Sequence, residues 1–98
     1  MSLFNTLIKS HPLILVDFYT DWCGPCKAMA PELKKLKDEM GDRIKIIKID
    51  TEKHQRLAAK FNIRSIPTIQ IYKQGKIVKQ QAGGLQLTQL RQLINEYK

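Results

Sequence analysis

Two cysteines separated by two residues are the part of this sequence best suited to chemistry. Cys23 and Cys26 are its only cysteines. The attacking species in disulfide exchange is a thiolate, so one sulfur of such a pair needs its charged form stabilised. Cys23 precedes a predicted helix, where its sulfur can face the positive end of the helix dipole and the unpaired N–H groups of the first turn. We therefore expect Cys23 to attack, and Cys26, one turn further in and more buried, to resolve the mixed disulfide.

The residues next to the cysteines fit a redox role. Gly24-Pro25 stiffens the turn between the two sulfurs and starts the helix, because proline suits the first helical turn. We expect these two residues to tune the redox behaviour of the pair. Trp22 supplies a flat apolar surface beside the sulfur. A fixed structural disulfide is the weaker alternative, since a bridge across so short a loop constrains the unfolded chain rather little.

A zinc site at the cysteines would need two further ligands. His11 and His54 are the only histidines, and His11 lies at the far end of the strand that leads to the cysteines. The sequence therefore predicts no metal site.

Asp17 is the one charged residue within the apolar run 13–19. Burial among β-branched and aromatic neighbours desolvates a carboxylate and raises its pKa. Asp17 lies just upstream of the thiols, in the strand that leads to them. This position favours a proton-transfer role. A hydrogen-bonded structural aspartate is the alternative.

The apolar pattern predicts the elements that position these residues. In the first half we expect a short helix from Ser2 to about Ser10, a buried strand over 13–19, a helix from Pro25 to Met40, and a strand from Ile44 to Asp50. In the second half we expect a helix from Thr51 to about Lys60, a hairpin over 68–79 with its turn at Gln74-Gly75, and a last helix from about Gln86. The pattern predicts a single α/β domain over residues 1–98. It would form a four-stranded mixed β-sheet, βαβ then ββα, flanked by helices on both faces.

Composition narrows the function classes. Ninety-eight residues are enough for one domain with its own core, and no apolar run approaches the roughly 20 residues of a membrane helix. No export signal is visible, so we expect a cytoplasmic protein, although a mature chain whose signal had been removed would look the same.

The net charge is +8, with its densest cluster at Lys34-Lys35-Leu36-Lys37. We expect a solvated helix face rather than a nucleic-acid or membrane surface, because base-stacking aromatic residues are not interleaved with these lysines.

The run from Val16 to Lys27, which includes Trp22-Cys23-Gly24-Pro25-Cys26, resembles the active-site segment of the thioredoxin family. Ile66-Pro67-Thr68 resembles that family's cis-proline loop, and Gly83-Gly84-Leu85 resembles its later glycine loop. The resemblance implies a thioredoxin-like fold in which Cys23 is the nucleophile, Cys26 the resolving thiol and Asp17 the buried group that assists Cys26. It also implies that a substrate chain docks in a groove lined by Trp22, Gly24, Pro25, Ile66, Pro67, Ala82 and Gly83.

The same resemblance implies partners and cofactors. The chain would reduce disulfides in client proteins without a bound cofactor, and a thioredoxin reductase that draws on NADPH would regenerate its dithiol. We expect a monomer. A redox-independent binding module or assembly subunit, using the groove around Trp22, is the alternative function.

One position departs from the family pattern. Ile46 occupies the place where many bacterial thioredoxins carry a lysine near the buried aspartate. Lys48 shares a strand face with Ile46 but lies two residues further along. With no cation assured near Asp17, we expect desolvation to raise the pKa of its carboxyl group.

Overall fold

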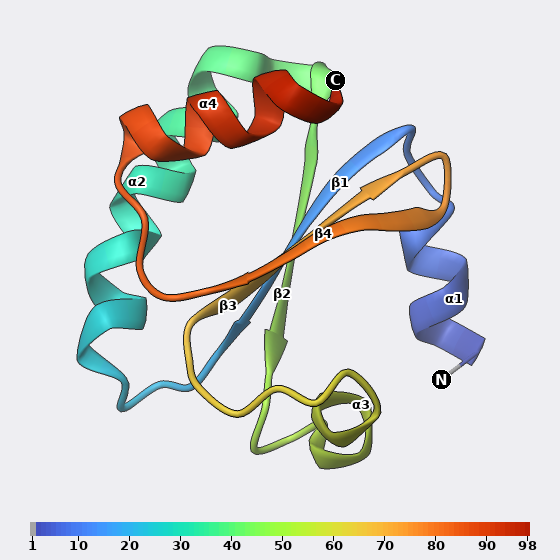
Figure 1. Ribbon diagram of the computed structural model, residues 1–98, viewed down its shortest axis with the longest axis vertical. Coiled ribbons are helices and arrows are strands. Elements are labelled where there is room, and N and C mark those ends of the chain that lie inside the picture. The colour runs from blue at the N-terminus through green and yellow to red at the C-terminus, as the bar shows by residue number, and fades with distance from the viewer. Residues whose placement is uncertain (1) are drawn as a thin grey trace.

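The structure is a computed structural model that describes residues 2–98. Its elements, in chain order, are α1 (Ser2–Ile8), β1 (Leu13–Tyr19), α2 (Gly24–Met40), the short 3-10 helix η1 (Gly41–Arg43), β2 (Lys45–Asp50), α3 (Gln55–Lys60), β3 (Thr68–Lys73), β4 (Lys76–Ala82) and α4 (Leu87–Tyr97) (Figure 1). None of the helices within residues 2–98 is long and apolar enough to cross a bilayer.

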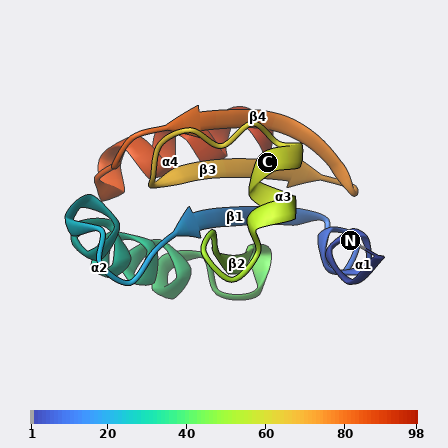
Figure 2. The same ribbon diagram turned by 90° about the horizontal axis from the view of Figure 1, so that it is seen from below.

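The four strands form one mixed sheet in the order β2-β1-β3-β4. β1 and β2 run parallel, while β3 is antiparallel to both β1 and β4. The strands follow one another in this order when the molecule is seen from below (Figure 2). The predicted βαβ unit followed by ββα is therefore confirmed.

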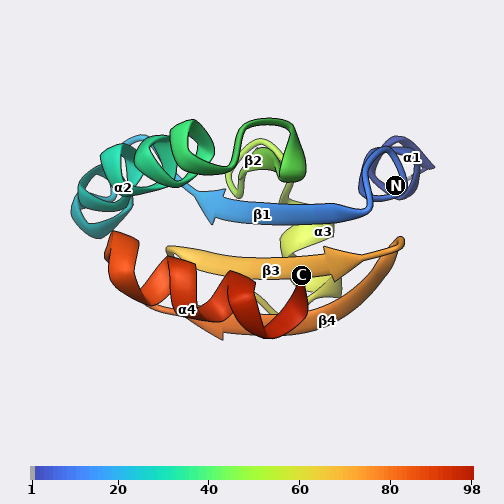
Figure 3. The same ribbon diagram turned by 90° about the horizontal axis from the view of Figure 1, so that it is seen from above.

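Helices cover both faces of the sheet (Figure 1). On one face α2 and α4 pack against Leu13 and Leu15 of β1; on the other α1 and α3 pack against Ile14 and Val16. Seen from above, α2 lies beside β1 and α4 beside β3 and β4 (Figure 3). Successive side chains of a strand point to opposite faces, so one buried apolar strand serves both halves of the core. Its first six residues are buried, as expected from a run that is apolar except for Asp17.

The predicted hairpin between β3 and β4 is confirmed. Gln74 and Gly75 form its two-residue turn, with φ of 52° and 79°. Positive φ at both central residues matches the type I′ geometry that suits the twist of a hairpin.

Two predicted helix boundaries were wrong. The third helix begins at Gln55 rather than Thr51, because the Asp50 carboxylate accepts hydrogen bonds from the N–H groups of Glu52 (2.9 Å) and Lys53 (3.4 Å) and holds that segment in a turn. The first helix ends at Ile8 rather than Ser10. There the N–H groups of Lys9 and Ser10 donate to carbonyls three residues back, a tightened final turn that closes the helix.

Candidate active site

The two cysteines form a disulfide at the start of α2. Cys23 is the N-cap of this helix, and its Sγ accepts a hydrogen bond from the Cys26 N–H at 3.1 Å. A helix N-terminus concentrates unpaired N–H groups and partial positive charge. The Cys23 sulfur faces these groups, whereas Cys26 lies inside the first turn.

The predicted difference in burial between the cysteines is wrong for this disulfide form. Cys23 is 4% exposed and Cys26 is 5% exposed. The reason is a neighbouring loop that covers Cys23, whose Sγ lies 3.7 Å from the carbonyl oxygen of Ile66. What distinguishes the two sulfurs is therefore hydrogen bonding at the helix end rather than exposure.

The loop before β3 borders the disulfide. The Ile66–Pro67 peptide bond is cis, as predicted. The N–H of Gly83 donates to the Pro67 carbonyl at 2.9 Å, and Ala82 pairs with Thr68. Three segments far apart in sequence thus meet beside Cys23: the start of α2, the loop before β3 and the end of β4.

A shallow hollow continues from the start of α2 toward the glycine loop. It measures about 280 Å³ and is lined by Pro25, Ala28, Met29, Glu32, Gly84, Leu85 and Gln86. A Cβ on Gly84 would lie 3.8 Å from the Pro25 carbonyl oxygen, so this loop packs closely against the turn between the cysteines.

Trp22 is 67% exposed, an unusual position for so large an apolar side chain. Its indole N–H donates to the carboxylate of Glu52, in the loop after β2. Since β1 and β2 are parallel, the loops that follow them meet at the same edge of the sheet. The hydrogen bond holds the ring at the rim of the disulfide site.

Asp17 is buried in the middle of β1, 1% exposed, and its Oδ1 has no hydrogen-bond partner among the described residues. Alternation along β1 places it on the face of Leu13 and Leu15, which α2 covers. Desolvation raises the pKa of this carboxyl group to about 6, and the charge of Lys48 opposes the rise without reversing it. The raised pKa follows the prediction.

Comparisons with known proteins agree with this geometry. The family model described as Thioredoxin matches residues 1–96. The thioredoxin of Bacillus subtilis is 42% identical over 88 residues, which cover 90% of this chain and 85% of that protein. The thioredoxin of Haemophilus influenzae is 41% identical over 93 residues, 95% of this chain and 87% of that one.

Solved structures show the same likeness. The oxidised thioredoxin of Plasmodium falciparum superposes with a TM-score of 0.84 at 35% identity, covering 99% of this chain and 91% of that one. The oxidised mitochondrial thioredoxin 3 of Saccharomyces cerevisiae gives 0.88 at 32% identity, covering 97% and 88%.

The chain belongs to the thioredoxin family. With a disulfide between the cysteines of its Trp-Cys-Gly-Pro-Cys segment, this thioredoxin-family chain is a thiol–disulfide oxidoreductase that acts on protein disulfides.

Sequence reasoning left the role of one residue of the site, Lys48, open and missed another. Lys48 lies directly opposite Asp17 in the β1–β2 register, so its charge acts on the carboxylate although position 46 is isoleucine and the two groups form no ion pair. Its Nζ also sits 4.7 Å from the centre of the Tyr19 ring. Glu52 is the second. The signal that could have found both is the parallel pairing of β1 with β2, which brings the end of β2 beside the end of β1.

No group of three or more His, Cys, Asp or Glu side chains is placed to hold a metal ion within residues 2–98. His11 instead contacts the backbone, accepting from the Leu13 N–H at 3.0 Å and lying 2.6 Å from the Asp42 carbonyl oxygen.

Proposed function

We propose that this protein reduces client disulfides through a two-step exchange in which Cys23 attacks and Cys26 resolves. The Cys23 thiolate displaces one client sulfur as a thiolate and forms a mixed disulfide with the other. Cys26 then gives up its proton and attacks Cys23 Sγ, which releases the second client sulfur. The client gains two electrons, and the protein ends in the disulfide form. The observation that carries this assignment is the position of Cys23 as the N-cap of α2.

Asp17 is the proposed acceptor of the Cys26 proton. Its carboxylate lies on the sheet face covered by α2, the helix that carries Cys26. With a pKa of about 6, Asp17 is mostly ionised at neutral pH but is a stronger base than an ordinary aspartate. An acceptor whose pKa lies near the working pH is the effective kind.

The client is proposed to dock in the groove formed by Trp22, Ile66, Pro67, Ala82 and Gly83, with Gly24 and Pro25 tuning the pair. Support comes from the contact between Cys23 Sγ and the Ile66 carbonyl, and from the Gly83–Pro67 hydrogen bond. An extended client segment could pair with the Ile66 backbone in the way that strands add to exposed edges. The exposed Trp22 ring would form one wall.

The partners extend this proposal. A chain in a structure on thiol resolution of the yeast mitochondrial 1-Cys peroxiredoxin via glutathione/thioredoxin systems superposes with a TM-score of 0.89 at 30% identity. We propose peroxide-reducing proteins as one class of client. We also propose that a thioredoxin reductase that draws on NADPH regenerates the dithiol. The protein would be a monomer with a single domain over residues 1–98 and no bound cofactor. It would lie in the cytoplasm and would bind neither nucleic acid nor membranes. One relative, from Oryza sativa, is named as chloroplastic, so related chains are not confined to one compartment.

Insulin reduction by dithiothreitol tests the activity against the redox-independent binding module. The wild-type chain should accelerate insulin precipitation, and Cys23→Ser should abolish the acceleration because the N-cap thiolate is lost. A wild-type chain that gives no acceleration would overturn the proposal in favour of the binding module.

Iodoacetamide labelling of the reduced protein, followed by mass mapping, tests the order of the thiols. Faster modification of Cys26 than of Cys23 would reverse their roles.

A further inference from the structure

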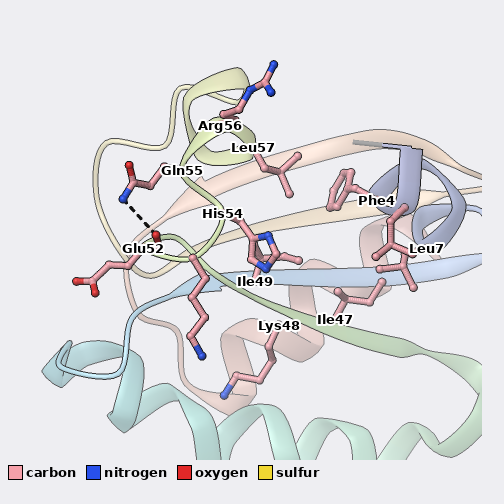
Figure 4. Close-up of a pocket in the computed structure, with 12 residues that line it drawn as sticks. Phe4, Leu7, Ile47, Lys48, Ile49, Glu52, His54, Gln55, Arg56 and Leu57 are labelled. Atoms are coloured by element: carbon pink, nitrogen blue, oxygen red, sulfur yellow. Dashed lines mark hydrogen bonds between the residues drawn. The ribbon is translucent and has the colours of Figure 1, made fainter.

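A hollow away from the disulfide lies at the outer edge of the sheet. It measures about 940 Å³ and is lined by α1, β2 and residues 52–57 (Figure 4). We name this hollow the β2 edge groove. Ile47 and Ile49 belong to the sheet face packed by α1 and α3, whereas Lys48 extends from the other side of β2 toward α2 (Figure 4). Because residues from both faces of β2 line this groove, the groove extends around the outer edge of β2.

Within residues 2–98 the outer edge of β2 is unpaired. There β2 is a terminal strand of the sheet and pairs with β1 alone. The N–H of Thr51 donates to the Tyr19 carbonyl at 2.9 Å, so the backbone of Thr51 points toward β1. Backbone groups alternate in direction along a strand, so those of Ile47 and Ile49 also point toward β1, while those of Ile46 and Lys48 point outward. The edge therefore offers N–H and C=O groups of two alternate residues to an added strand.

The chemistry around this edge is apolar on one side and basic on the other. Leu3, 71% exposed on α1, adds apolar surface beside the groove. Lys48, Lys53 and Arg56 are exposed, and no carboxylate of residues 2–98 lies within ion-pair distance of them. The one acidic residue of the lining, Glu52, is engaged by the Trp22 indole.

We propose that the β2 edge groove binds an extended segment of a partner protein in which acidic and apolar side chains alternate. Such a segment adds a fifth strand to the sheet beside β2, with hydrogen bonds to Ile46 and Lys48. Its apolar side chains face Leu3 and α1, and its acidic side chains face Lys48, because successive side chains of a strand point to opposite faces.

Charge decides between this partner and a second copy of the chain. Each copy carries a net charge of +8, and pairing through two β2 edges would bring lysines against lysines. Lysines on an edge strand are a known obstacle to pairing between copies. The other terminal strand, β4, is a poorer candidate because its register with β3 shifts between Ile71 and Tyr72, and such irregularities discourage addition of a strand.

Amide hydrogen exchange followed by NMR tests the proposal on the full chain in its disulfide form. The probe is a blocked seven-residue peptide, Glu-Val-Glu-Ile-Glu-Val-Glu. At saturation, exchange of the Ile46 and Lys48 amides should slow at least tenfold, while the Ile47 and Ile49 amides, already paired with β1, stay unchanged. Peptides with lysine in place of glutamate, or proline in place of the central isoleucine, should give no protection.

Four results would overturn the proposal. The first is unchanged exchange at Ile46 and Lys48 with saturating probe. The second is probe-induced slowing at Ile66 or along β4 instead, which would place the peptide at the active-site groove or the opposite edge. The third is slowing without probe that rises with protein concentration, which would make a second copy the occupant.

The fourth result comes from matched charge reversals. Lys53→Glu in the groove should weaken probe binding roughly three- to tenfold, the range expected when an exposed attraction becomes a repulsion. Lys76→Glu makes the same change in net charge on exposed β4 and should alter the affinity less than twofold. Equal weakening by the two variants would mean that net charge alone attracts the peptide.

Discussion

Replacing Asp17 by asparagine should stabilise the protein increasingly as pH rises. Burial raises the pKa of the Asp17 carboxyl group from 3.8 to about 6, so the folded chain holds this proton more tightly than the unfolded chain does. A raised folded pKa means that ionisation opposes folding: the cost grows as pH rises above the unfolded pKa and levels off above the folded one. The asparagine side chain carries no charge at any of these pH values, so the Asp17→Asn variant escapes the cost.

The size of the effect follows from the two pKa values. Their difference corresponds to about 3 kcal/mol at about 1.4 kcal/mol per pH unit. Roughly 0.5 kcal/mol of this has accrued at pH 4, so the advantage of Asp17→Asn should grow by about 2.5 kcal/mol between pH 4 and pH 8. Because Asp17 is 1% exposed, solvent screening does not reduce this figure much.

Urea unfolding of both proteins at pH 4, 6 and 8, with the cysteines kept as the disulfide, measures this difference. The same variant, once reduced, should slow insulin reduction, because asparagine cannot accept the Cys26 proton. A stability advantage that stays constant from pH 4 to pH 8 would refute the reasoning. It would show that the carboxylate is solvated or fully compensated, and the proton-acceptor role would lose its physical basis.

Two further predictions concern the residues that contact the site. Lys48→Met should raise the pKa of Asp17 above about 6, because the opposing charge is removed. Lys45→Met, on the other face of β2, should leave this pKa unchanged. Carboxyl ¹³C NMR titration measures the pKa in both variants, and equal shifts would contradict a direct effect of the Lys48 charge on Asp17. Glu52→Ala should lower the fluorescence anisotropy of Trp22, the only tryptophan, because its indole loses its acceptor; unchanged anisotropy would show that the ring is held by other contacts.

The parts of the fold that depend on local pattern could be predicted from the sequence. The run of β1, which is apolar except for Asp17, indicates a strand covered on both faces, and Gln74-Gly75 indicates a tight hairpin turn. The position of the cysteine pair follows in the same way, because Pro25 marks the first turn of a helix directly after a strand. Each of these depends on residues close together in the chain.

The parts that depend on register and on loops from elsewhere in the chain could not be predicted. Lys48 lies opposite Asp17 because of the register between β1 and β2. The similar apolar patterns of the two strands would also fit a register shifted by two residues. The equal burial of the cysteines depends on a loop more than 40 residues away, which brings Ile66 over Cys23. The late start of α3 depends on whether the Asp50 side chain binds the following N–H groups, a competition between two local structures.

Trapping of the mixed disulfide tests the central claim, that Cys23 attacks protein disulfides and Cys26 releases the product. Reduced Cys26→Ser and Cys23→Ser variants are mixed with insulin, quenched with acid and analysed by mass spectrometry without reductant. We predict that Cys26→Ser accumulates a covalent complex through Cys23, that Cys23→Ser forms none, and that the wild-type chain ends as its internal disulfide with reduced insulin chains. A complex formed through Cys26 in the Cys23→Ser variant, with none in Cys26→Ser, would contradict the account.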